Sequence, residues 1–148
     1  MNYIGIDPGS ASGYIAVITD TGYERFAFKN TTLREMYVFL LKYSTFSYCV
    51  LEKVWGIPGM SVKAVSSFIL NKGHIEAMLT ATLTPWRDET PMTWMKFYGM
   101  KKQKEETKTA WKNRLKDLAE RRMPLAPITM ENADAFLIAL YCKETYNK

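Results

Sequence analysis

The stretch Tyr3-Ile4-Gly5-Ile6-Asp7-Pro8-Gly9-Ser10 is an apolar segment that ends in a carboxylate and a Pro-Gly turn. It predicts the first strand of a sheet, closed by a tight turn. Asp7 is unusual there, because acids on core elements rarely stay buried unless they are paired or bind a metal. The position of Asp7 therefore suggests that it binds a cation or handles a proton.

Two further acids share this anomaly, and a fourth acid lies near one of them. Glu52 closes the apolar segment at residues 48–51, Asp134 interrupts the apolar stretch at residues 133–141, and Glu131 precedes Asp134 by one helical turn. Each acid alone is also compatible with a turn cap or a surface position. Their joint pattern is more specific, and a cluster of carboxylates without Cys or His partners favours Mg²⁺ or Mn²⁺ over zinc. Two such ions about 3.5–4 Å apart support phosphoryl transfer.

The pattern along the chain predicts an α/β fold. Residues 3–7, 14–19 and 23–28 predict a three-stranded meander, and a helix at residues 33–43 follows the possible capping box of Thr32 and Glu35. A fourth strand ends at Glu52, and a crossover through the helix would place it beside the first strand, next to Asp7. The last helix could then deliver Asp134 across from both acids.

The remaining elements complete one predicted domain, residues 1–148, with a mixed five-stranded sheet flanked by helices. A long helix with one apolar face should follow the N-cap Ser61. The expected elements are a helix at 62–79, a strand at 82–86, a short helix that begins at Thr90-Pro91 and ends at Gly99, a charged helix at 104–120 and a helix at 132–143.

Basic residues are concentrated in one segment of the chain. The net charge is +5, and residues 96–122 contain ten Lys or Arg against four Asp or Glu, a net +6 that leaves −1 for the rest. A basic segment at residues 96–122, together with carboxylates on core elements, suggests that the protein binds a polyanion. The alternative is an ordinary solvated amphipathic helix.

Other features are less informative. No secretory signal is recognised, and no uncharged run approaches the roughly 18 residues of a membrane span, so a soluble, cytosolic protein is expected. Cys49 and Cys142 lie in apolar patterns and fit core thiols better than a disulfide or metal pair. His74 fits a structural or surface position.

Three motifs in this order resemble RuvC-type Holliday junction resolvases, which are crossover junction endodeoxyribonucleases with an RNase H-like fold. They are Ile4-Gly5-Ile6-Asp7-Pro8-Gly9-Ser10 with Gly13, Leu51-Glu52-Lys53-Val54-Trp55, and Asn132-Ala133-Asp134-Ala135-Phe136-Leu137-Ile138-Ala139-Leu140. The chain length is similar to that of compact, phage-type members. The first motif alone also resembles the phosphate loop of actin-like kinases, whereas the three together are specific.

The resemblance implies roles for individual residues. Asp7, Glu52 and Asp134 would be catalytic acids that bind metal, with Glu131 in a fourth position where the family more usually has Asp or His. Trp55 matches an aromatic residue inserted at the junction centre, although a packing role is the alternative. Lys96 would stabilise charge at the scissile phosphate, unless it is a plain surface lysine. Lys101, Lys102 and Lys104 would hold neighbouring phosphates.

The resemblance also implies a homodimer, formed through the helix at residues 62–79, that makes paired nicks in four-way DNA junctions. Such an enzyme would use Mg²⁺, or alternatively Mn²⁺, with two ions per site, leave 5′-phosphate ends and need no nucleotide cofactor. Three alternatives remain open. They are a broader fork or flap endonuclease, a non-catalytic junction-binding protein and an actin-like ATPase, for which 148 residues are too few.

Overall fold

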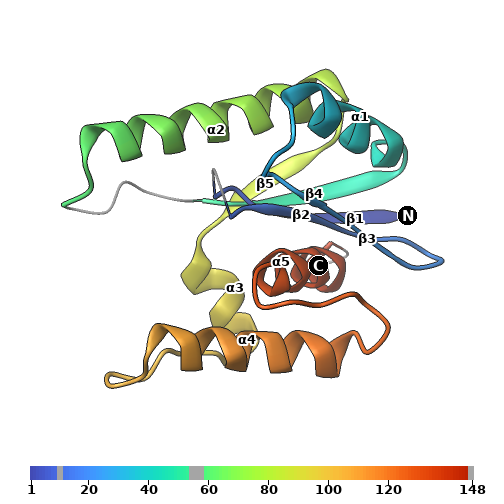
Figure 1. The fold of residues 1–148 in the computed structure, drawn as a ribbon. Helices are drawn as coiled ribbons and strands as arrows, with labels where there is room; N and C mark the ends of the chain where they lie inside the picture. Colours follow the sequence, from blue (N-terminus) through green and yellow to red (C-terminus); the bar gives the residue numbers. More distant parts are fainter. Residues whose placement is uncertain (10–11, 54–58, 147–148) are drawn as a thin grey trace.

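Five strands form one mixed sheet in the order β3-β2-β1-β4-β5, in a computed structural model that describes residues 1–9, 12–53 and 59–146 (Figure 1). Strand β1 pairs antiparallel with β2 and parallel with β4, which confirms that the fourth strand lies beside the first. The strands are β1 (Asn2–Asp7), β2 (Tyr14–Ile18), β3 (Tyr23–Ala27), β4 (Ser47–Glu52) and β5 (Trp86–Glu89).

Helices cover both faces of the sheet. Helices α1 (Leu33–Tyr43) and α2 (Val62–Ala81) lie on one face, and α5 (Ala133–Thr145) packs on the other (Figure 1). Helix α4 (Lys108–Arg122) lies over α5, and the short α3 (Pro91–Phe97) also contacts α5. Every residue of α5 from Ala133 to Cys142 is buried. A helix enclosed in this way has no polar face, which explains its continuous apolar sequence.

Gly5 allows α5 to pack directly against β1. A Cβ atom added at Gly5 would lie 2.2 Å from the backbone nitrogen of Ala139 and 2.3 Å from the carbonyl oxygen of Ala135. Only glycine permits an approach this close between a strand and a helix backbone. The first turn of α5 is thereby held near the carboxyl end of β1.

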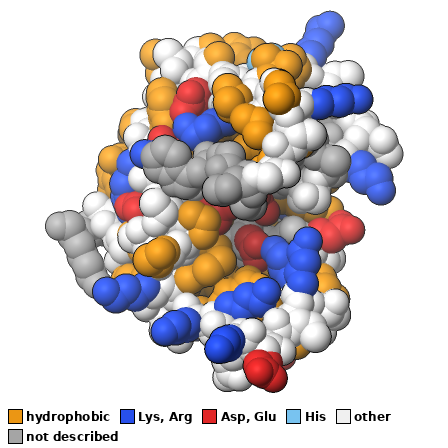
Figure 2. Space-filling view, turned by 90° about the vertical axis from the view of Figure 1, so that its left-hand side faces the viewer, with side chains coloured by type: hydrophobic (Ala, Val, Ile, Leu, Met, Phe, Trp, Pro, Cys, Tyr) orange, Lys and Arg blue, Asp and Glu red, His pale blue; other side chains and the backbone are white. Residues whose placement is uncertain are grey.

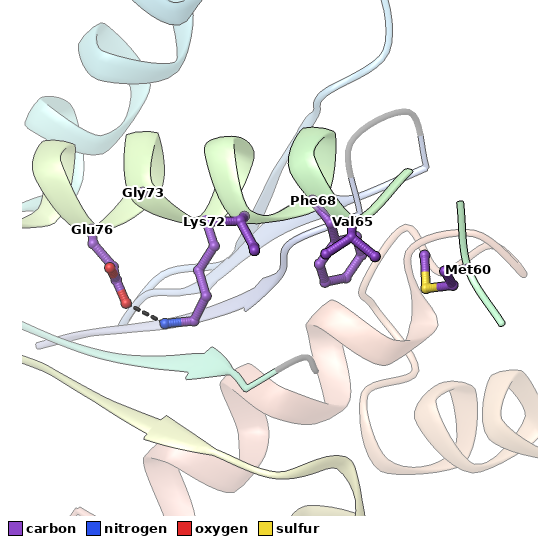
Figure 3. Close-up of a pocket in the computed structure, with 7 residues that line it drawn as sticks. Met60, Val65, Phe68, Lys72, Gly73 and Glu76 are labelled. Carbon is purple, nitrogen blue, oxygen red and sulfur yellow. Dashed lines mark hydrogen bonds and ion pairs between the residues drawn. The ribbon is translucent and has the colours of Figure 1, made fainter. Parts of the chain in front are cut away.

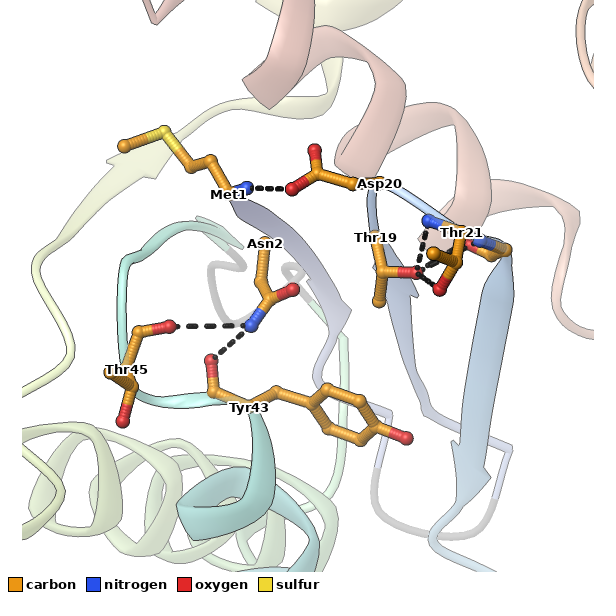
Figure 4. A network of polar contacts seen from close by, with 8 residues as sticks. Met1, Asn2, Thr19, Asp20, Thr21, Tyr43 and Thr45 are labelled. Carbon is orange, nitrogen blue, oxygen red and sulfur yellow. Dashed lines mark hydrogen bonds and ion pairs between the residues drawn. The ribbon is translucent and has the colours of Figure 1, made fainter.

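Polar contacts fix the opposite end of β1 (Figure 4). The Met1 ammonium lies 2.5 Å from a carboxylate oxygen of Asp20, and the Asn2 side-chain amide donates to the carbonyls of Tyr43 at 3.1 Å and Thr45 at 3.3 Å. These bonds tie the start of β1 to the β2–β3 turn and to the end of α1. The strand is therefore anchored at the end that lies away from Asp7.

Several local predictions are confirmed. Thr32 and Glu35 form the predicted capping box, Ser61 caps α2, and Thr90 caps α3 with Pro91 in its first turn. Both cysteines are free and buried, as expected of core thiols. In the part of the chain that the structure describes, no helix is long and apolar enough to cross a membrane.

The predicted position of the fifth strand was wrong. Residues 82–84 form the turn after α2, where Leu83 has φ 55° and the Thr84 N–H donates to the Leu79 carbonyl at 2.9 Å. The strand follows at Trp86–Glu89 and is mostly polar because it lies at the edge of the sheet. Its polar sequence hid it from a search for apolar runs.

The charged helix begins later than predicted. Its first residue is Lys108 rather than residue 104, because the Thr107 hydroxyl accepts from the Ala110 N–H at 3.1 Å and sets the helix start there. It ends at Arg122, two residues beyond the predicted end. Lys104 therefore lies in the loop before α4.

Candidate active site

Asp7 and Glu52 end neighbouring parallel strands at the same edge of the sheet. Ile6 pairs with Leu51 in the β1–β4 register, so the next residue of each strand is one of the two acids. Glu52 is 8% exposed and Asp7 is partly buried. The strand pairing thus brings together two acids that are 45 residues apart in the sequence.

Asp134 reaches the same place from the first turn of α5. The start of this helix is fixed by the buried Asn132, whose side chain accepts from the Thr129 N–H at 2.7 Å and donates to the Pro127 carbonyl at 3.0 Å. Asp134 is 8% exposed, and its Oδ1 is buried without a hydrogen-bond partner. A buried carboxylate oxygen in this state is costly unless a cation approaches it.

The three carboxylates act on one another electrostatically. Burial and the charge of Asp134 together raise the pKa of Asp7 to about 6, against the opposing effect of Lys112. Burial also raises the pKa of Glu52 to about 8, with added contributions from the charges of Asp7 and Asp134. The negative charge of the three carboxylates is therefore not fully compensated by nearby positive charge.

Lys112 is the cation of this cluster, and the sequence analysis missed it. It extends from α4 and forms an ion pair with Asp134. Burial lowers the pKa of Lys112, but the charge and the hydrogen bond of Asp134 outweigh this effect, so the pKa lies above its usual value. In the sequence it is one of ten basic residues between positions 96 and 122, and nothing local marks it out.

Trp94 orients Glu52 and was also missed as a site residue. Its indole N–H donates to Glu52 Oε1 at 2.9 Å, and the side chain is completely buried in α3. A buried tryptophan usually finds an acceptor for its N–H. From the sequence, this rule predicts that a buried tryptophan will bond to some acceptor, but it does not identify Glu52 as that acceptor.

Glu131 does not join the other three acids. It is exposed and accepts a hydrogen bond from the Tyr14 hydroxyl at 3.0 Å. The charges that act on Glu52 are those of Asp7, Asp134 and Lys112, and Glu131 is not among them. Three of the four predicted acids therefore act on one another in this arrangement, and a metal-binding role for Glu131 stays a prediction.

The donor set fits a hard divalent cation, although the side chains do not yet converge on one point. Among residues 1–9, 12–53 and 59–146, no three Asp, Glu, His or Cys side chains are placed to hold one metal ion. The three clustered acids nevertheless offer only oxygen donors, one buried oxygen of Asp134 lacks a partner, and the pKa shifts indicate a deficit of positive charge. Mg²⁺ and Mn²⁺ match these features.

The predicted DNA-contacting lysines lie on the surface, in α3 and in the loop that follows it. Lys96 is exposed in the last turn of α3, and Lys101, Lys102 and Lys104 are exposed in the loop that follows. Figure 2 shows acidic side chains near the middle of this face, with Lys and Arg side chains around its lower half. Trp55 lies outside the described residues.

The first half of α2 packs poorly within the protein. None of its residues from Val62 to His74 is buried, and Ile69 is 66% exposed. Met60, Val65, Phe68 and Ile69 line a shallow cavity of about 190 Å³, next to the ion pair of Lys72 and Glu76 (Figure 3). Val62 and Ile69 of the apolar face predicted for this helix are thus exposed, whereas Val65, Phe68 and Met78 are partly buried and Ile75 and Leu79 are buried.

The mixed five-stranded sheet with helices on both faces is an RNase H-like fold, as predicted. The structure is similar to T. thermophilus RuvC in complex with a Holliday junction substrate, with a TM-score of 0.68 and 15% identity over 99% of this chain and 96% of that chain. Another structure of Thermus thermophilus RuvC matches with a TM-score of 0.59 and 15% identity, covering 95% of this chain and 92% of that one. By sequence, the chain matches no family model and no curated protein.

Proposed function

We propose that this protein is a RuvC-type Holliday junction resolvase, a homodimeric endonuclease that makes paired nicks in four-way DNA junctions. The observation that carries the proposal is the meeting of Asp7, Glu52 and Asp134 at one edge of the sheet, beside a basic surface. Support comes from the structural neighbour, a RuvC in complex with a Holliday junction substrate.

In this proposal Asp7, Glu52 and Asp134 hold divalent metal, Mg²⁺ or alternatively Mn²⁺, with two ions per site. When bound, such ions supply an activated water for in-line hydrolysis of the phosphodiester and neutralise the leaving oxygen, giving 5′-phosphate ends. Glu131 would be a fourth ligand, and one of its two carboxylate oxygens accepts from the Tyr14 hydroxyl.

The other residues position groups or balance charge. Trp94 keeps the Glu52 carboxylate in one orientation through its N–H bond. Lys96 stabilises negative charge that develops on the phosphate. Lys101, Lys102 and Lys104 contact neighbouring phosphates, which would make binding strongly dependent on salt. Trp55 would stack on a base at the junction centre.

The proposal is tested with an immobile four-way DNA junction, each strand end-labelled in turn, incubated with and without Mg²⁺. Paired, symmetric nicks in opposing strands that need metal are expected. A Y-shaped fork of the same sequence separates the main alternative, because a general branched-DNA nuclease would cut it equally well. Tight junction binding without cleavage under either Mg²⁺ or Mn²⁺ would support a non-catalytic binding protein.

Asp7→Asn should abolish cleavage, with a loss of at least about a thousandfold, and leave junction binding within about twofold. The substitution removes one charged metal ligand and does not touch the basic surface. Asp20→Asn is the matched control, because Asp20 is an exposed acid at the other end of β1. Cleavage gels and fluorescence anisotropy measure the two quantities, and loss of binding together with cleavage would contradict this division of roles.

A further inference from the structure

A second feature of the basic surface is a cavity of about 740 Å³ between α3 and α4. Its lining combines apolar side chains with three lysines. The lining residues are Met92, Met95, Lys96, Gly99, Met100, Lys101, Lys102 and Trp111. Figure 2 shows hydrophobic side chains flanked by Lys and Arg side chains in the lower half of this face, over α3 and α4.

The cavity is built by the turn that ends α3. Gly99 has φ +66°, a left-handed conformation that suits glycine, and the Met100 N–H donates back to the Met95 carbonyl at 2.8 Å. Arg114 then fastens the following loop to α4, through Glu106 at 2.9 Å and the Lys101 carbonyl at 3.4 Å. These contacts hold the lining residues in place without a ligand.

The cavity is connected to the acidic cluster through α3 and α4. In α3, Trp94 bonds to Glu52, and the next two residues, Met95 and Lys96, line the cavity. In α4, Lys112 pairs with Asp134, and the preceding Trp111 lines the cavity. In each of these two helices, one residue thus contacts the acids, and the residues next to it in the sequence line the cavity.

The lining chemistry selects the occupant. Thioether and indole groups offer a polarisable apolar surface, and nothing in the lining is acidic. A flat group attached to phosphates satisfies both the apolar lining and the lysines. We propose that the cavity receives one unpaired nucleobase of the DNA beside the scissile phosphate, while Lys96, Lys101 and Lys102 contact the adjacent phosphates. This inference rests on the proposed function and adds a base-binding site to it.

An abasic scan tests the assignment. Wild-type protein in EDTA, which prevents cleavage, is titrated with junctions that lack a single base at successive positions around the branch point. Loss of the base should weaken binding about tenfold at one position near the cut site, since a base held by stacking contributes about 1–3 kcal/mol. Positions other than this one and the base on which Trp55 would stack should change binding less than about twofold.

Met92→Ala and Met100→Ala connect this effect to the cavity. Each substitution should weaken binding of the intact junction about threefold. Neither should weaken binding of the junction that lacks the base at the sensitive position, because the contacts between that base and the methionine are already absent there. Leu41→Ala, an exposed aliphatic truncation on α1, is the control and should change neither. Thermal melting verifies that all variants fold.

The outcomes separate this inference from the proposed function. If the intact junction binds no better than a linear duplex, the proposed function fails and the base site with it. Two outcomes would overturn only the base site while binding stays selective for the junction. In the first, the abasic scan is flat. In the second, removing the base at the sensitive position weakens binding as much in both methionine variants as in the wild type.

Discussion

Lys112 shows how much a single residue depends on its surroundings. It lies on an otherwise charged helix, yet its ammonium group pairs with Asp134 and interacts electrostatically with Asp7 and Glu52. Without Lys112, three carboxylates would face one another with no positive charge among them. The side chain therefore serves as an internal counter-ion, and a divalent cation would compete with it for the same oxygens.

Lys112→Met should lower the metal-free stability by about 2 kcal/mol and tighten Mn²⁺ binding about tenfold. Breaking a partly buried ion pair leaves uncompensated charge, whereas losing the competing ammonium favours the metal. The matched control is Lys116→Met, one turn further along α4, where the pair with Glu120 is more exposed and contributes little to stability. Denaturant unfolding in EDTA and calorimetric titration with Mn²⁺ measure the two effects; equal changes in both variants would contradict this role.

The acids also make the stability depend on pH. Folding raises the pKa of Asp7 from 3.8 to about 6 and that of Glu52 from 4.5 to about 8. The folded state therefore binds more protons than the unfolded state between about pH 4 and pH 8. Consequently, the free energy of unfolding of the metal-free protein should fall as the pH rises through this window.

Glu52→Gln should remove much of the decrease in the free energy of unfolding with rising pH. The neutral amide keeps an acceptor for Trp94 but carries no charge, so the variant should be more stable than wild type at pH 8.5 by about 2 kcal/mol or more. At pH 4.5, where Glu52 is protonated in the folded protein, the two should melt within about 2 °C of each other. Thermal melting in EDTA at both pH values provides the measurement, and a pH-independent difference would show that the charge is not the cause.

At the scale of elements, the contact between β1 and α5 sets the geometry of the site. Gly5 lets the helix backbone touch the strand, and Asp134 sits in the first turn of that helix. Asp7 lies two residues beyond Gly5 on the same strand. The distance between the acids is therefore coupled to how closely the two elements pack.

Gly5→Ala should destabilise the protein by about 3 kcal/mol, because the new methyl group meets backbone atoms that cannot move aside. It should also reduce junction cleavage more than junction binding, since α5 shifts with Asp134. Gly22→Ala is the control, because its Cβ would meet nothing within 4 Å. Urea unfolding and cleavage assays measure the effects, and wild-type stability of Gly5→Ala would refute the close-packing argument.

At the scale of the whole molecule, the exposed part of α2 is the surface through which we propose that two subunits pair. Val62, Ile69 and Leu70 are 83%, 66% and 60% exposed on a helix whose only buried residues are Ile75 and Leu79. Apolar surface of this kind normally marks an interface. A dimer through α2 would present two active sites to opposing strands of one junction, as the proposed paired nicks require.

Ile69→Glu should convert the dimer to a monomer and uncouple the two nicks. A charge in an apolar interface remains unpaired, so association should weaken by at least about a hundredfold. Leu125→Glu, which places the same charge on an 88% exposed position after α4, should remain dimeric. Light scattering after gel filtration gives the mass, and a wild-type protein that is itself monomeric would contradict the α2 interface.

Much of this molecule was predictable from local patterns. Apolar strands, capping residues and three motifs predicted the α/β sheet, the pairing of β1 with β4 and the acids Asp7, Glu52 and Asp134. These features were readable because strand periodicity and helix caps depend on residues near in sequence. The edge strand β5 was misplaced because its polar sequence carries no such signal.

Tertiary structure alone decided the rest. Lys112 and Trp94 contact the acids only because α4 and α3 pack beside α5, and Glu131 bonds to Tyr14 and is not among the charges that act on Glu52. A charged or aromatic side chain acquires its partner from contacts across tens of residues, which sequence spacing does not encode. The sequence by itself thus predicted the three acids that strand pairing and α5 bring together, and only the packing of helices on the sheet determined what surrounds them.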